Sequence, residues 1–196
     1  MGAEMGEIAE RYRRRADAFE AKVAAVKADQ WGNQSPCEKW SARDVVDHIV
    51  AMHGYMLMPV NRRLTAVPVA EDPLGAFRAA KAAVEAVLDD PEAAEQDCDT
   101  PAGRMTVEAQ IDQVVSDDLV LHGWDLARAT GQNETMDPAD VERLWTSTTA
   151  IPADVMTKYR TPDAFGPGIE VYGAEVEVPE DAPLQDRLLG FIGRNP

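Results

Sequence analysis

Stretches with apolar residues at every third or fourth position alternate along the chain with stretches rich in Gly, Pro, Asn and Asp. The first pattern predicts amphipathic helices and the second predicts the loops between them. We expect helices over about 5–28, 41–59, 73–89, 106–131 and 137–158, with Pro152 interrupting the last, and a short closing helix from Pro183. Residues 168–178 alternate apolar and polar positions, which predicts a short β-hairpin.

These elements define a mainly all-α fold class, an antiparallel four-helix bundle with extra C-terminal helices and a short β-hairpin. We expect residues 1–160 to form the bundle and residues 161–196 to pack on the same domain as a hairpin and a short helix. The predicted helix at 106–131 differs from the others because ionisable side chains lie on its apolar face.

Counting about 100° per residue from Ile111 places Asp118, His122 and Asp125 on the inward face of that helix, whereas Asp117 is expected to point to solvent. Asp118 and His122 are four residues apart, so their side chains stack one above the other. A carboxylate and an imidazole on an apolar face cost free energy unless something binds them. A divalent metal would bind both; a buried ion pair that fixes the helix register is the alternative.

Metal sites in helical bundles take ligands from facing helices, so a partner is expected from the helix at 41–59. The chain has three histidines, and two of them, His48 and His53, belong to that helix. They flank its apolar stripe on opposite sides, and periodicity does not choose between them.

Composition restricts the classes of partner. The formal net charge is -16, with 35 acidic and 19 basic residues, which argues against nucleic acid and anionic membranes as partners. No apolar run approaches the roughly 18 residues of a membrane span. The two cysteines form no CxxC pair and the charged start has no apolar leader, so we expect a reducing cytoplasm. Cys37 has no base beside it in the sequence and is expected to be a structural thiol.

Two strings, SPCEKWSARDVVDHI (35–49) and DLVLHGWDLARATG (118–131), together resemble the metal-binding helical-bundle family that includes mycothiol-dependent maleylpyruvate isomerase. That family belongs to the DinB-like, YfiT-like superfamily, and the likeness continues into the closing helix. By position, the resemblance implies a metal site made of His48, Asp118 and His122. The family usually has Glu where this chain has Asp118, which is about 1.3–1.5 Å shorter. Asp125 and His53 are therefore candidates for a supporting partner or substitute ligand.

Two imidazoles and one carboxylate favour zinc, with nickel, iron or manganese as alternatives, and three protein ligands leave one position open. The resemblance implies an S-transferase or isomerase that uses a low-molecular-weight thiol such as mycothiol on a small electrophile. Trp40 and Trp124 are candidates to line a substrate pocket, although tryptophans in such positions more often anchor a core. Maleylpyruvate isomerases carry a further C-terminal domain, so that reaction is not assumed here.

The sequence is also compatible with other functional classes. A non-catalytic metal-binding or small-ligand-binding bundle, a metal-dependent hydrolase and a purely structural helical protein are the alternatives. Bundles of this superfamily often pair, which leaves a homodimer open as well.

Overall fold

The computed structural model describes residues 2–65, 67–100, 103–164 and 171–196, with side chains from residue 6 onward. The chain forms two compact units, Met1–Glu134 and Thr135–Pro196. From the sequence we expected the bundle to end near residue 160. The helix that begins at Pro138 packs with the closing helix of the chain, so it belongs to the second unit.

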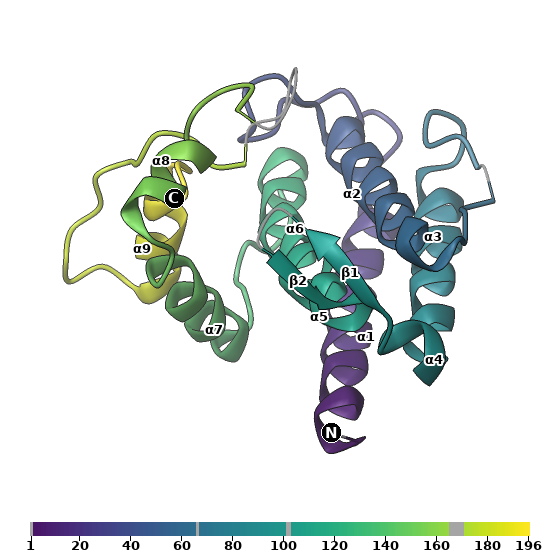
Figure 1. Cartoon of the computed structure of the whole chain (residues 1–196). Coiled ribbons are helices and arrows are strands. Elements are labelled where there is room, and N and C mark those ends of the chain that lie inside the picture. The colour runs from purple at the N-terminus through teal and green to yellow at the C-terminus, as the bar shows by residue number, and fades with distance from the viewer. Residues whose placement is uncertain (1, 66, 101–102, 165–170) are drawn as a thin grey trace. The chain divides into compact units, whose positions relative to one another are not determined.

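The four longest helices of the first unit form its bundle: α1 (Gly2–Ala25), α2 (Ala42–Leu57), α3 (Pro73–Leu88) and α6 (Asp117–Thr130) (Figure 1). Both α1 and α2 pack against α3 and α6, so α1 and α2 lie on one diagonal of the bundle. The predicted mainly α-helical bundle is confirmed. Its fully buried apolar side chains come from every helix and include Tyr12, Val45, Ile49, Phe77, Val84, Ile111 and Leu126.

Local capping chemistry explains where these helices begin and end. The Ser41 side chain accepts a hydrogen bond from the Asp44 amide while the Asp44 carboxylate accepts one from the Ser41 amide, a capping box at the start of α2. Asp72 caps α3, with proline in its first turn. Gly131 ends α6 with a φ of 65°, a left-handed conformation that glycine adopts without strain.

The predicted helix at 106–131 is one helical run with a wider turn inside it. It consists of α5 (Val107–Ile111), the π-helical segment η2 (Asp112–Ser116) and α6. Asp117, which we expected to face solvent, instead accepts a 2.7 Å hydrogen bond from Arg15 on α1. Arg11 holds Asp112 through two hydrogen bonds of 2.8 Å. Arginines of α1 therefore bind the π-helical segment and the residue after it through hydrogen-bonded ion pairs.

A β-hairpin is present, but in a different place from the one predicted. Strands β1 (Asp97–Thr100) and β2 (Gly103–Thr106) pair antiparallel in the first unit, after the short helix α4 (Pro91–Ala94). The sequence suggested a loop there, because these strands are short and polar, and of β1 only Cys98 is buried.

In the predicted hairpin region, residues 171–178 form no strand, and residues 165–170 lie outside the described part of the chain. The backbone amides there bond to helix ends instead of to each other. The Tyr172 amide donates to the Tyr159 carbonyl at 3.2 Å, and the Val176 amide donates to the Gly190 carbonyl at 2.9 Å. Alternating polarity alone does not distinguish these two outcomes.

The second unit contains α7 (Pro138–Thr149), α8 (Ala153–Tyr159) and α9 (Leu184–Phe191). Pro152 separates α7 from α8, as the sequence predicted. Within the described ranges, every helix is too short or too polar to cross a bilayer.

Candidate metal centre

Helices α2 and α6 bring His48, Asp118 and His122 together at one place in the first unit. One ligand atom from each of the three lies within 4.8 Å of the other two. His48 Nε2 is 3.5 Å from Asp118 Oδ2, and the ring centroids of His48 and His122 are 4.8 Å apart. The structure thus places side by side the three residues that the resemblance had singled out.

The spacing of these atoms suits a metal ion. In a tetrahedral zinc site, metal–nitrogen and metal–oxygen distances of about 2.0–2.2 Å separate neighbouring ligand atoms by about 3.4 Å. The 3.5 Å between His48 and Asp118 matches that separation and exceeds the roughly 2.7–3.2 Å of an ordinary hydrogen bond. Despite its shorter side chain, Asp118 therefore lies at the separation from His48 that a shared cation would require.

Exposure differs across the three side chains. Those of His48 and Asp118 are 27% and 26% exposed, whereas that of His122 is 10% exposed. The site is therefore partly exposed at His48 and Asp118 and nearly buried at His122.

Asp125 fixes the orientation of His122. The Nδ1 atom of His122 donates a 2.8 Å hydrogen bond to the Asp125 carboxylate, which is fully buried. With the proton on Nδ1, Nε2 is the ring nitrogen that carries the lone pair for a cation. Carboxylates that bind the far nitrogen of a ligand histidine commonly fix its tautomer in this way.

Trp40 forms an aromatic wall beside the site. Its ring lies 4.7 Å from the His48 ring and 5.6 Å from the His122 ring, measured between centroids. The loop that carries Trp40 is held by hydrogen bonds from the Ser35 amide at 2.9 Å and the Gln34 side chain at 3.1 Å to the Trp40 carbonyl.

Trp124 has a different position. It comes two residues after His122, about 200° further around α6, and is 2% exposed, with Arg128 over its ring at 5.0 Å. The structure therefore places Trp40 at the site and turns Trp124 to another side of the helix.

His53 belongs to the core. It is fully buried, with Nδ1 2.7 Å from the Ile49 carbonyl and Nε2 2.9 Å from the Tyr12 hydroxyl. Burial lowers the pKa of His53 to about 4 and outweighs the hydrogen bond to Ile49. Because both ring nitrogens are engaged, His53 is poorly suited to the role of substitute ligand.

Sequence reasoning missed the neighbourhood of Cys37. Its Sγ atom lies 3.6 Å from the Asp125 carboxylate, across 88 positions of sequence. Cys37, His122 and Asp125 form a second group whose ligand atoms lie within 4.8 Å of one another. Nothing in the linear sequence connects the loop to this point of α6, so Cys37 was expected to have no base nearby.

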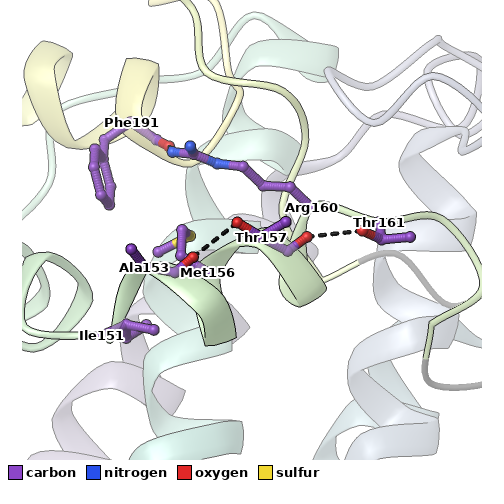
Figure 2. A pocket seen from close by; sticks show the side chains of 7 residues that line it. All are labelled: Ile151, Ala153, Met156, Thr157, Arg160, Thr161 and Phe191. Atoms are coloured by element: carbon purple, nitrogen blue, oxygen red, sulfur yellow. Dashed lines mark hydrogen bonds between the residues drawn. The ribbon is translucent and has the colours of Figure 1, made fainter.

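The second unit contains a cavity of about 530 Å³ (Figure 2). It is lined by residues of α8, by Ile151 before that helix, by Arg160 and Thr161 after it, and by Phe191 of α9. Most of its polar side-chain atoms are already hydrogen-bonded, although Arg160 Nε is buried without a hydrogen-bond partner among the described residues. The hydroxyls of Thr157 and Thr161 donate to helix carbonyls at 2.8 Å. The Arg160 guanidinium bonds the Phe191 carbonyl at 2.7 Å and Glu175 at 3.1 Å. The cavity therefore offers weaker chemistry than the cluster between α2 and α6.

Fold and site together define a helical-bundle protein with two imidazoles and one carboxylate converging at a partly exposed position. Residues 12–127 match the family model described as the mycothiol maleylpyruvate isomerase N-terminal domain. That match spans more than half of the chain, and the chain belongs to this family.

Known proteins extend the likeness beyond the bundle. The chain is 32% identical over 190 residues to two uncharacterised proteins from two strains of Mycobacterium tuberculosis, covering 93% of this chain and 95% of each relative. It also superimposes on the crystal structure of a mutant mycothiol-dependent maleylpyruvate isomerase with a TM-score of 0.53 at 14% identity, covering 81% of this chain and 74% of that one. This structural likeness shows a shared fold.

Proposed function

We propose that the protein is a thiol-dependent S-transferase or isomerase that acts on a small electrophile at a divalent cation held by His48, Asp118 and His122. The observation that carries this proposal is the convergence of three ligand atoms within 4.8 Å of one another, with His48 and Asp118 partly exposed. Membership of a family described by a mycothiol-using isomerase supports a low-molecular-weight thiol of the mycothiol type as co-substrate.

The donor set fits a catalytic cation. Zinc is the first candidate, with nickel, iron or manganese as alternatives, because two imidazoles and one carboxylate suit all four. A bound cation would lower the pKa of a coordinating thiol and so supply a thiolate at neutral pH. A reducing cytoplasm, where such thiols stay reduced, is the compartment that this activity requires.

Each protein group has a distinct task in this proposal. The single charge of Asp118 leaves a divalent site with a net charge of +1, which favours binding of an anionic sulfur or an anionic electrophile. Asp125 keeps the Nε2 lone pair of His122 directed at the site. Trp40 shields one side from water and gives an organic ligand an apolar surface beside His48.

Elemental analysis combined with a conjugation assay tests this function. We expect wild type to bind a stoichiometric divalent cation and to conjugate a generic electrophile with at least one low-molecular-weight thiol. His122→Ala should lose both properties. Asp47→Asn, which removes an exposed carboxylate next to His48, should keep both.

Two results would contradict the proposal. If His122→Ala kept its full metal content, the proposed metal site would be wrong. If turnover survived complete chelation, the cation would have no part in catalysis. Stoichiometric metal with no turnover for any thiol tested would assign the protein to non-catalytic metal-binding bundles instead.

A further inference from the structure

A second set of donors lies on the opposite nitrogen of His122. Asp125 and His122 are three residues apart on α6, and Cys37 approaches them from the loop between α1 and α2. The set comprises one thiol, one carboxylate and one imidazole, with ligand atoms within 4.8 Å of one another. The family resemblance uses His122 through the first site only.

In this set the sulfur–oxygen distance matches a cation site, whereas the nitrogen–oxygen distance is that of a hydrogen bond. With metal–sulfur at about 2.3 Å and metal–oxygen at about 2.0–2.2 Å, a tetrahedral site separates sulfur from oxygen by about 3.6 Å. Cys37 Sγ and Asp125 Oδ2 are 3.6 Å apart. His122 Nδ1 and Asp125 Oδ2 are 2.8 Å apart and need to separate to about 3.4 Å.

The loop holds Cys37 in this position through its backbone. The Cys37 carbonyl accepts hydrogen bonds from the Trp40 amide and from the Gln34 side chain, both at 2.9 Å. The Ser35 hydroxyl lies 3.2 Å from the Cys37 amide, which donates to it. The thiol therefore faces α6 as part of an ordered turn. Because the turn is already ordered, binding an ion there loses little conformational entropy.

We propose that Cys37 Sγ, the Asp125 carboxylate and His122 Nδ1 form a second cation position that takes thiophilic cations such as Cd²⁺ and excludes a cation from the first position. Thiolate, carboxylate and imidazole together carry a charge of -2, against -1 for His48, Asp118 and His122. A soft thiolate ligand adds selectivity for soft cations.

Exclusion follows from the chemistry of one imidazole. A neutral ring has a single nitrogen lone pair, so a cation on Nδ1 requires the ring proton to sit on Nε2. His122 then presents a donor rather than a lone pair to His48 and Asp118. Binding at the second position releases the Cys37 thiol proton to solvent and moves the Nδ1 proton to Nε2. A thiophilic cation would therefore prevent cation binding at the first site without contacting His48.

Cadmium titration tests this proposal without any assay of turnover. Thiolate-to-cadmium charge transfer absorbs in the ultraviolet, and we expect that band in wild type, in His48→Ala and in Cys98→Ser. Cys37→Ser and Cys37→Ala should lose it, with folding checked by circular dichroism. Cys98 is the matched control because it is buried and burial raises the pKa of its thiol.

Competition between metals tests the exclusion. Zinc or nickel bound by wild type should leave as cadmium is added, while Cys37→Ser should keep it under the same conditions. A cadmium band of wild-type intensity in folded Cys37→Ser would overturn the second site. Stoichiometric zinc and cadmium held together by wild type would overturn the exclusion. Neither result bears on the proposed function, which depends on His48, Asp118 and His122.

Discussion

The burial of His53 predicts a defined loss of stability in mild acid. The ring donates from Nδ1 to the Ile49 carbonyl and accepts at Nε2 from the Tyr12 hydroxyl, so a neutral imidazole satisfies every partner. Burial lowers the pKa of His53 from 6.5 to about 4. The unfolded chain takes up this proton near pH 6.5 and the folded protein does not, so acid favours unfolding between the two pKa values.

The size of the effect follows from the pKa difference. At about 1.36 kcal/mol per pKa unit, the shift removes about 3.4 kcal/mol of stability below pH 4, of which about 1.8 kcal/mol is lost between pH 7 and pH 5. In His53→Gln the side chain stays polar but cannot titrate. The variant should be less stable than wild type at pH 7, and the difference should shrink by about 1.8 kcal/mol at pH 5.

Urea denaturation followed by circular dichroism at several pH values between 7 and 5, in the presence of a chelator, measures this difference. His48→Gln, which removes a partly exposed histidine of the same helix, is measured in parallel as the control for loss of a histidine outside the core. Parallel stability curves for wild type and His53→Gln would refute the reasoning. Cation binding should persist in His53→Gln, since a core residue is not a ligand.

Three further substitutions test the packing and the site. Gly123→Ala should raise the free energy of unfolding by up to about 1 kcal/mol, because its Cβ would meet nothing nearer than a Phe19 atom at 3.7 Å; a lower urea midpoint would show that this side of α6 is tighter. Gly190→Ala should lower the melting temperature, because its Cβ would lie 2.7 Å from the Val176 carbonyl oxygen; an unchanged value would contradict that contact. Asp125→Asn should weaken cation binding about 10- to 100-fold. A wild-type affinity measured by calorimetry would contradict the role of Asp125 in orienting His122.

Helices were predictable from the sequence because their determinants are local. A capping serine, a proline in the first turn or a glycine after the last turn acts within a few residues, as Ser41 and Gly131 show. The hairpin was placed wrongly because strand pairing depends on which amides find partners elsewhere. Residues 171–178 alternate in polarity, yet the Val176 amide bonds to the end of α9.

The candidate site was only partly accessible from the pattern of residues. The spacing of Asp118 and His122 on one stripe could be read directly, but the choice of His48 over His53 came from the family resemblance. Those two histidines flank the same stripe, and a tyrosine on α1 decides that His53 is a core residue. The proximity of Cys37 to Asp125 is a tertiary fact across 88 positions, so no local pattern encodes it.

The direction of Asp118 depends on contacts outside the site. Helix α6 packs between α1 and α2, and adjacent residues differ by about 100° around it. Asp117 is held by Arg15 of α1, while Asp118 lies 3.5 Å from His48 of α2. The ion pair on one side of α6 thus helps to fix the rotation that turns Asp118, the proposed ligand, toward α2 on the other side. A π-helical turn is rare and generally needs tertiary support, which Arg11 supplies through Asp112. A relative that keeps all three proposed ligand residues should therefore still lose their convergence if these arginines of α1 are replaced.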